Sequence, residues 1–244
     1  MTASTAPGTT PRLAIVGAGK MGRTIVHLAP ERGFRVVAMI DAAHNPQGRG
    51  ITRASLNGAD VAVEFTRPDA AADNVEALLR QGVATVSGTT GWYEQLERVR
   101  GVAVETNGAL FTAPNFSLGV AMFARIATVA ARAVARTPGF DAHLVETHHA
   151  AKKDAPSGTA ALLRDTLREP LGREIAVSSV RTGSVPGTHE LIFDAPFEQL
   201  RLIHEARDRR VFADGALVAA RWLIGRRGTF TMDDLVRDLT AGDP

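Results

Sequence analysis

The 244-residue sequence contains no cysteine and few aromatic side chains, and these shortages exclude several classes of function. Without cysteine there are no disulfides, no thiol catalysis and no cysteine-based metal sites, and a reducing compartment is favoured. Aromatic residues make up 5% of the chain, and no basic run is interleaved with them, so stacking platforms for nucleic-acid bases are not expected. The net charge of +2, from 28 basic and 26 acidic side chains, is too diffuse to indicate a nucleic-acid partner.

A long uninterrupted hydrophobic run is also missing. The most apolar segment, residues 117–135, is interrupted by Arg125 and Arg132, which are costly in lipid, so we expect a packed helix and no membrane partner. Residues 1–12, MTASTAPGTTPR, lack the apolar segment of a signal peptide and are expected to form a loose polar tail.

The first half of the chain carries the pattern of a dinucleotide-binding domain. The apolar run LAIVG opens into GAGKMG and then into a helical pattern, so Gly17, Gly19 and Gly22 match GxGxxG. In that motif the glycines permit a tight turn, the approach of a pyrophosphate and the packing of helix on strand. A second apolar run ends at Asp41, 24 residues after Gly17, where an acid accepts hydrogen bonds from ribose hydroxyls. The alternative is a glycine turn in an unrelated α/β domain.

The residues around Asp41 favour NADH over NADPH. The sequence AAHN follows it directly, so a 2′-phosphate would meet a carboxylate with no adjacent arginine. Arg49 and Arg53, in a segment expected to form a loop, lie near enough to reverse this preference. We therefore predict NADH or NADPH as the cofactor, with NADH favoured.

Strand and helix patterns alternate as far as residue 116. Residues 59–66 and 83–92 are predicted strands that run into loops, residues 68–82 are a predicted helix, and residues 101–116 are expected to add short strands. This alternation predicts a Rossmann-like, doubly wound parallel sheet, whose carboxyl-end loops converge on one crevice.

From residue 117 the pattern changes, and a smaller α+β domain for substrate binding and oligomerisation is expected over residues 117–212. It contains a long helix, a strand with the sequence FDAHLVET, a second helix and three further alternating runs, which together predict an antiparallel sheet with helices on one side. Residues 213–244 are expected to return to the first domain and to complete residues 13–116.

Reactive side chains are concentrated in residues 146–160, ETHHAAKKDAPSGTA. His148 and His149 follow the alternating strand pattern, so their side chains are expected on opposite faces, one towards a cleft. Lys152 lies in the following loop. Adjacent histidines and lysines can also be ordinary surface residues. Zinc is disfavoured, because there is no cysteine and no HExxH spacing, and no metal is expected.

A helix is expected to begin near Ser157 and to stop at Pro170. Its start would point the amides of Gly158 and Thr159 outward, with the positive end of the helix dipole behind them. Imidazoles, an ammonium group and a helix N-terminus together suit an anionic substrate that must receive a proton.

Seven segments in order along residues 13–239 resemble the dihydrodipicolinate reductase family of bacterial lysine and diaminopimelate synthesis. They are GAGKMG, EFTRP, SGTTGW, APNFSLGV, HHAAKKDAPSGTA, RTGSVPGTH and FADGALVAARWL, of which APNFS and KKDAPSGTA are the specific ones. The resemblance implies NADH- or NADPH-dependent reduction of dihydrodipicolinate, a cyclic imine dicarboxylate derived from 4-hydroxy-tetrahydrodipicolinate, to tetrahydrodipicolinate. It also implies a cytoplasmic homotetramer. The chain departs from the family pattern at Glu64, where an aspartate is common.

The resemblance further implies residue roles. His148 becomes a proton donor or acceptor, Lys152 a proton donor, and His149, Gly158 and Thr159 substrate contacts. The positions that match cofactor contacts are Gly17, Ala18, Gly19, Lys20, Met21, Gly22, Asp41, Gly88, Thr89, Thr90, Ala113, Pro114, Asn115 and Phe116.

Two other functions compete with this interpretation. Another two-domain amino-acid dehydrogenase, acting on aspartate or diaminopimelate, would have a similar cofactor half, but the DAPSGTA loop argues against it. A non-catalytic dinucleotide sensor would be expected to lack the proton donors, whereas His148 and Lys152 are both present.

Overall fold

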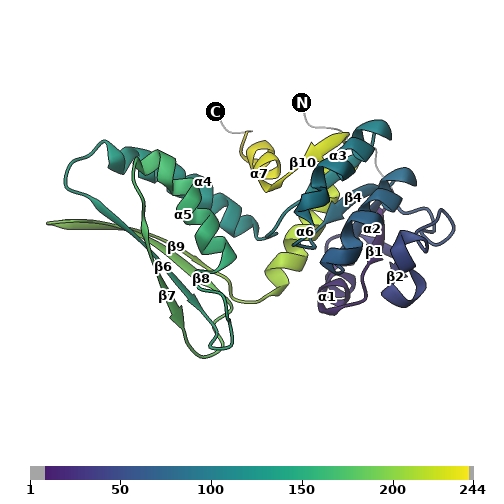
Figure 1. The fold of residues 1–244 in the computed structure, drawn as a ribbon, viewed down its shortest axis with the longest axis horizontal. Helices are drawn as coiled ribbons and strands as arrows, with labels where there is room; N and C mark the ends of the chain where they lie inside the picture. Colours follow the sequence, from purple (N-terminus) through teal and green to yellow (C-terminus); the bar gives the residue numbers. More distant parts are fainter. Residues whose placement is uncertain (1–8, 242–244) are drawn as a thin grey trace. The chain divides into compact units, whose positions relative to one another are not determined.

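The computed structural model describes residues 9–241, so most of the tail predicted for residues 1–12 lies outside the described residues. The chain forms two compact units, which we describe separately. Unit 1 contains the residues up to Phe116 together with those from Phe212, and unit 2 contains Ser117–Val211. Figure 1 shows the elements of each unit.

Unit 1 is built on a six-stranded parallel sheet with the order β10-β5-β4-β3-β1-β2. Its strands are β1 (Arg12–Val16), β2 (Arg35–Ile40), β3 (Val61–Glu64), β4 (Ala84–Ser87), β5 (Ala109–Thr112) and β10 (Gly228–Phe230). Every residue of β3, β4 and β5 is buried, as expected for central strands covered on both faces. The predicted Rossmann-like sheet is therefore confirmed.

The helices of this unit are α1 (Lys20–Leu28), α2 (Pro68–Arg80), α3 (Leu96–Glu105) and α7 (Met232–Thr240), together with α6 (Arg210–Leu223), which begins two residues before the unit boundary. Short 3-10 helices lie at η1 (Ala42–His44), η2 (Pro46–Gly48) and η3 (Tyr93–Gln95). In the glycine turn between β1 and α1, backbone oxygen atoms lie where a larger residue would have its Cβ. A Cβ added at Gly17 would lie 2.0 Å from the Phe65 oxygen, and one at Gly22 would lie 1.9 Å from the Gly17 oxygen.

The strand expected at the start of residues 101–116 is wrong, because α3 continues through Gly101 to Glu105. Val99, Val102 and Ala103 have the spacing of one helix face and are buried against the apolar residues of α2. Packing on α2 therefore outweighs the strand propensity of the valines, and only β5 forms a strand in this region.

Unit 2 contains a four-stranded sheet with the order β7-β6-β8-β9. The strands are β6 (Asp141–His148), β7 (Ala176–Arg181), β8 (Thr188–Ala195) and β9 (Glu198–Glu205). Strand β6 pairs in parallel with β7, whereas the β6–β8 and β8–β9 pairs are antiparallel. The sheet is thus mixed rather than wholly antiparallel, because the helix between β6 and β7 returns the chain in the same direction.

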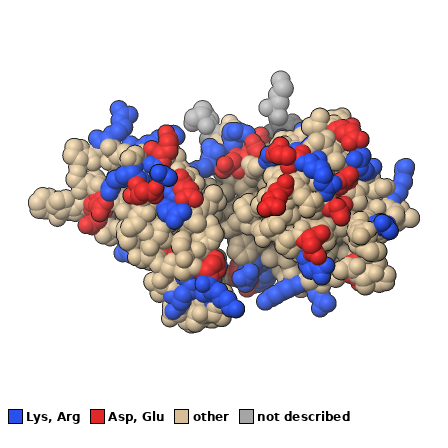
Figure 2. Space-filling view, in the orientation of Figure 1, with Lys and Arg blue, Asp and Glu red and all other residues tan. Residues whose placement is uncertain are grey.

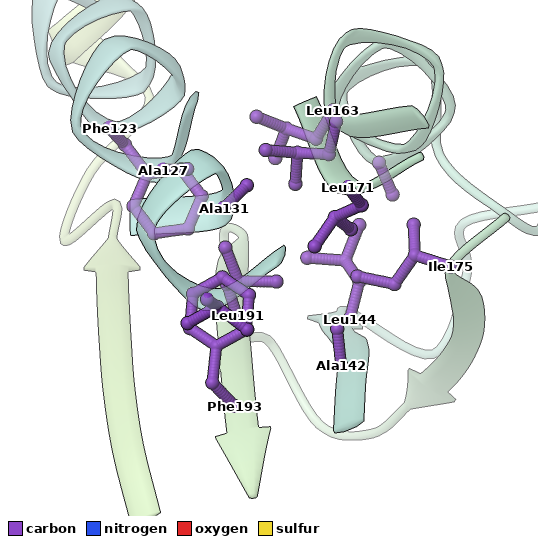
Figure 3. Packing of buried hydrophobic residues seen from close by; sticks show 13 residues of the cluster. Phe123, Ala127, Ala131, Ala142, Leu144, Leu163, Leu171, Ile175, Leu191 and Phe193 are labelled. Carbon is purple, nitrogen blue, oxygen red and sulfur yellow. The ribbon is translucent and has the colours of Figure 1, made fainter. Parts of the chain in front are cut away.

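Helices α4 (Leu118–Ala135) and α5 (Gly158–Leu171) pack on this sheet. Figure 3 shows the resulting core, in which Phe123 and Ala131 of α4 and Leu163 of α5 approach Leu144 and Leu191 of the sheet. Among the described residues, α4 is the helix that is long and apolar enough to cross a membrane, but its buried face belongs to this core. It is a packed helix, as the sequence predicts.

The boundaries of α5 agree with the prediction at one end only. Ser157 is the N-cap, and its hydroxyl accepts a hydrogen bond from the Ala160 amide at 3.2 Å. The predicted stop at Pro170 is wrong, since the helix continues to Leu171 and ends at Gly172 in the left-handed conformation, with φ +68. A proline in the last turn removes a single donor, which the helix tolerates there.

Candidate active site

In unit 1 a cavity of about 540 Å³ lies at the carboxyl ends of β1, β2 and β3. Its size falls within the range of small-molecule sites. The cavity is lined by the predicted residues Gly17, Ala18, Gly19 and Asp41, and also by Asn45, Phe65, Thr66, Arg67 and Asn74 among others. Helix α1 begins at Gly19 without a side-chain cap and without an acidic residue in its first turn, so its N-terminal amides suit an anion.

The other predicted cofactor residues lie near this end of the sheet but do not line the cavity. Lys20, Met21 and Gly22 form the first turn of α1. Gly88–Thr90 follow β4, and Ala113–Phe116 follow β5. Because β4 and β5 run parallel to β1 and β3 in the same sheet, the two segments emerge at the same end of the sheet as the glycine turn.

Asp41 is held by a residue that the sequence had not connected with it. One oxygen, Oδ1, accepts hydrogen bonds from the His44 amide at 3.1 Å and lies 2.8 Å from His44 Nδ1. The hydrogen bond with the His44 side chain is the main reason that the pKa of Asp41 is lowered. Asp41 is therefore an ionised carboxylate at neutral pH, and the 3-10 turn of η1 keeps an imidazole beside it.

Glu64, at the end of β3, is completely buried beneath the loops of this region. Its Oε1 accepts hydrogen bonds from the Thr66 amide at 3.0 Å and from Thr89 Oγ1 at 2.8 Å, and its Oε2 accepts one from Ser87 Oγ at 2.6 Å. Burial raises the pKa of Glu64, and the hydrogen bonds oppose that rise. The side chain ties the loop after β3 to the loop after β4.

In unit 2 the two adjacent histidines differ in environment. His148 ends β6 and is 8% exposed, with its side chain on the helix-facing side of the sheet, whereas His149 follows the strand and is half-buried. His148 Nδ1 lies directly against the Glu146 carboxylate, two residues earlier on the same face. The alternation of β6 thus turns one histidine inward, and a buried acid fixes its ring.

Glu146 is the centre of a buried charge network. It has no exposed surface, and its Oε1 accepts hydrogen bonds from Arg181 at 2.6 Å and from the Ser157 amide at 3.3 Å. Burial alone would raise its pKa, but hydrogen bonds from Arg181 and Ser179 and the charges of His148 and Arg181 outweigh burial and lower the pKa to about 2. Glu146 therefore stays ionised and joins β6, β7 and the start of α5.

A second buried histidine completes this cluster. His189 of β8 lies with its ring centroid 5.4 Å from that of His148 and its Nε2 3.4 Å from Ser157 Oγ. Burial, with the charges of His148 and His204, lowers its pKa to about 4. The pKa of His148 is also lowered, mainly by burial, although Glu146 opposes the effect. His189 is consequently neutral near pH 7 and adds no charge beside His148.

Three members of this cluster, Glu146, His148 and His189, place potential metal-ligand atoms within 4.8 Å of one another. Arg181 is bound to the same carboxylate and already supplies a positive charge. A cation would have to bind next to a guanidinium, which is electrostatically unfavourable. The positive charge that Glu146 requires is therefore already provided by Arg181.

The loop before α5 gathers the remaining predicted groups. Lys152 Nζ donates to both carboxylate oxygens of Asp154, at 2.8 and 2.9 Å, and this contact is the main reason that the pKa of Asp154 is lowered. Arg181 donates to the Asp154 backbone carbonyl at 2.6 Å. The sequence had not connected Asp154 with Lys152, and the role of the Gly158 amide as a substrate contact stays a prediction.

Sequence reasoning assigned no role to Glu146, Asp154, Arg181 or His189. Glu146 had a usable signal, because a charged residue on the inward face of an alternating strand needs a buried partner. Arg181 and His189 are the two ends of RTGSVPGTH, a segment that carries the family resemblance but to which no residue roles were assigned. They reach the site through strand register, which pairs His148 with Arg181 and Glu146 with His189.

The basic and acidic side chains are interspersed on the face that Figure 2 shows, in both units.

Comparisons with known proteins agree with the two-unit architecture. Residues 11–116 match the family described as "Dihydrodipicolinate reductase, N-terminus", and residues 119–236 match "Dihydrodipicolinate reductase, C-terminus".

Similar full-length proteins carry the corresponding name. The 4-hydroxy-tetrahydrodipicolinate reductase of Christiangramia forsetii is 32% identical, over 93% of this chain and 98% of that protein. Those of Chromobacterium violaceum and Archaeoglobus fulgidus are each 34% identical, over 92% of this chain and 97% and 99% of theirs. Dipicolinate-bound dihydrodipicolinate reductase from Paenisporosarcina sp. TG-14 has the same fold, with a TM-score of 0.78 at 24% identity over 93% of this chain and 100% of that one. The chain therefore belongs to the dihydrodipicolinate reductase family, as its motifs predict.

Proposed function

We propose that this protein reduces dihydrodipicolinate, formed from 4-hydroxy-tetrahydrodipicolinate, to tetrahydrodipicolinate with NADH or NADPH in lysine and diaminopimelate biosynthesis. The observation that carries the proposal is the cluster in unit 2, where the buried Glu146–His148 pair, the Lys152 ammonium group and the start of α5 occur together. The family gives the reaction, and these residues provide the proton donors and anion contacts that the reaction needs.

The cavity of unit 1 fits a dinucleotide. No side chain obstructs the turn at Gly19, because a Cβ added there would meet nothing within 4 Å, and the uncapped amides of α1 can receive a pyrophosphate. When bound, the nicotinamide cofactor supplies the hydride. Asp41 is placed to accept hydrogen bonds from the ribose hydroxyls.

We infer a preference for NADH. The Asp41 carboxylate is ionised, because its hydrogen bonds with His44 lower its pKa, and a carboxylate repels a 2′-phosphate. Titration of both cofactors against the wild type and Asp41→Ala tests this. The substitution should weaken NADH more than NADPH, and a wild-type preference for NADPH would contradict the proposal.

Reduction of the conjugated imine leaves electron density on the ring, which a proton must neutralise. Lys152 is proposed as the proton donor, and His148 as a donor or acceptor whose Nδ1 is held by Glu146. Gly187 leaves room beside the other ring nitrogen, since a Cβ there would lie 3.0 Å from His148 Nε2. His149 and the amides of Gly158 and Thr159 are proposed to contact the substrate carboxylates.

The decisive experiment follows NADH absorbance with freshly generated dihydrodipicolinate, and with oxaloacetate plus ammonia as the substrate of the rival dehydrogenase. Oxidation should occur with dihydrodipicolinate alone. Lys152→Ala should lower kcat by roughly 10² to 10⁴ and leave NADH affinity nearly unchanged. A kcat within a few-fold of the wild-type value would contradict the role of Lys152 as proton donor.

We also propose a cytoplasmic homotetramer, with copies meeting through unit 2. Helices α4 and α5 contribute to the core on one side of its sheet, while Val180 and Ile203 on the opposite side are 42% and 58% exposed. Ile203→Glu should dissociate the assembly in light-scattering measurements, whereas Leu239→Glu, a change of an exposed residue on α7 of unit 1, should not. A monomeric wild type would contradict this assignment.

A further inference from the structure

Asp154 places its own carboxylate on the groups that the proposed function assigns to the substrate. The Lys152 ammonium group donates to both of its oxygens, at 2.8 and 2.9 Å, and the backbone of Gly158 also contributes to the lowered pKa of Asp154. An ammonium group and a helix-start amide are also the donors that a substrate carboxylate would use. The chain therefore presents an internal anion at this position.

Helix capping does not explain this contact. The N-cap of α5 is Ser157, whose hydroxyl already accepts the Ala160 amide and which is itself held through its backbone by buried Glu146. Asp154 lies three residues before that cap, and its side chain is 56% exposed. The helix start is thus complete without the Asp154 carboxylate.

The backbone of Asp154 is fixed while its side chain is able to rotate. Arg181 donates to its carbonyl oxygen at 2.6 Å, and Arg181 is in turn paired with the buried carboxylate of Glu146. Rotation about the side-chain bonds would therefore carry the Asp154 carboxylate into solvent without moving the loop. Such a rotation would free the Lys152 ammonium group.

We propose that Asp154 is a displaceable internal carboxylate, which holds the substrate-carboxylate subsite in the unliganded protein and is expelled by the incoming dicarboxylate. This inference rests on the proposed function, because it assumes that Lys152 and Gly158 face the substrate. While the subsite is empty, Asp154 keeps the Lys152 side chain directed towards it. The Asp154 carboxylate therefore competes with the substrate carboxylate, because part of the binding free energy of the substrate is used to break the internal contacts.

Asp154→Asn tests the competition, with pyridine-2,6-dicarboxylate as the probe. The amide is nearly isosteric but carries no charge, so it binds the ammonium group more weakly. The inhibition constant of the probe should fall about 3- to 10-fold, or 0.7 to 1.4 kcal/mol, with NADH affinity unchanged. The matched control is Asp165→Asn, which removes the same charge from an exposed side chain of α5 that pairs with Arg164. This control should change the inhibition constant less than 2-fold.

An unchanged or increased inhibition constant in folded Asp154→Asn would overturn the inference, because Asp154 would then be a fixed support for Lys152. Circular dichroism establishes folding for each variant. Lys152→Ala separates this failure from failure of the proposed function. If Lys152→Ala loses both turnover and affinity for the probe, while Asp154→Asn does not lower the inhibition constant of the probe, only the displacement of Asp154 is contradicted. If Lys152→Ala changes neither turnover nor affinity for the probe, the assignment of Lys152 to the substrate-carboxylate subsite is contradicted as well.

Discussion

Each unit of the protein buries one glutamate completely, and the two residues are held in opposite ways. Glu64 ends β3 in unit 1 and is surrounded by hydroxyl and amide donors, so burial raises its pKa. Glu146, near the end of β6 in unit 2, faces a guanidinium and an imidazole, and its pKa falls to about 2. Burial alone therefore does not set the charge of a carboxyl group. The charge carried by its hydrogen-bond donors decides which form is stable.

The difference corresponds to two tasks. Glu64 ties together two loops at the dinucleotide side of unit 1, and this task needs hydrogen-bond acceptors rather than a permanent charge. Glu146 holds the His148 ring and the Arg181 guanidinium, and both contacts depend on a full negative charge. Matched substitutions of the two residues test this distinction.

The largest effect is expected for Glu146→Gln. The amide leaves Arg181 as a largely buried cation without its carboxylate partner, which should cost about 3 kcal/mol of unfolding free energy. It also releases the His148 ring, and kcat should fall roughly 10²-fold. Urea unfolding followed by far-ultraviolet circular dichroism measures the first quantity. A loss below about 1 kcal/mol would contradict the view that the ionised carboxylate is essential.

A smaller effect should follow when both charges are removed. In Glu146→Gln combined with Arg181→Met, no buried charge remains unpaired, so at least half of the lost stability should return while activity stays low. The same urea titration and the NADH assay provide both readouts. Equal instability of the single and double variants would show that the unpaired guanidinium is not the cause.

The pH dependence of stability should distinguish the two residues further. The folded-state pKa of Glu146, about 2, lies below its ordinary value of 4.5, so its contribution is complete above pH 4.5 and is lost as the pH falls towards 2. At most about 3 kcal/mol is involved. The stability gap between the wild type and Glu146→Gln should therefore narrow from pH 6 to pH 3. A constant gap would contradict the lowered pKa.

The smallest effect, with the opposite sign, is expected for Glu64→Gln. The folded-state pKa of Glu64 is raised, so its stabilising contribution is complete below pH 4.5 and is lost as the pH rises through that higher value. Glutamine stays neutral, so the variant should gain up to about 1 kcal/mol over the wild type between pH 5 and pH 8. Fluorescence reports on this unit, because Trp92 and Trp222 both belong to it. If Glu64→Gln instead becomes less stable than the wild type as the pH rises from 5 to 8, the raised pKa of Glu64 is contradicted.

Local sequence patterns predicted much of this architecture because their causes are local. Gly22 is fixed by a backbone contact with Gly17 in its own turn, and Ser157 caps the helix that begins with the next residue. The pairing of Glu146 with Arg181 depends instead on the register between β6 and β7, which no short motif specifies. A register shift of one residue would place the guanidinium on the other face of the sheet.

The remaining errors arose where tertiary contacts overruled local preference. Val102 belongs to a valine-rich run that favours a strand, but it is buried against α2 as part of α3. At the start of α5, no pattern in the sequence showed that the Asp154 carboxylate pairs with Lys152. Helix starts and glycine turns can be read from sequence, whereas the side chain that occupies them depends on the folded loop.

The discontinuity of unit 1 has a consequence for protein synthesis. Strand β5 ends at Thr112, but its edge partner β10 begins only at Gly228, after the whole of unit 2 has been translated. At ordinary ribosomal speed the β5 edge stays unpaired for roughly 5 to 20 s. During that interval the nascent chain carries an open edge at β5, whose backbone N–H and C=O groups are available for pairing with another chain. Closure also requires Gly215 to pass beside the Phe116 carbonyl, where a Cβ would lie 1.7 Å from the oxygen. Translation that stops before Gly228 leaves a chain whose second unit can be complete while its first sheet still lacks an edge.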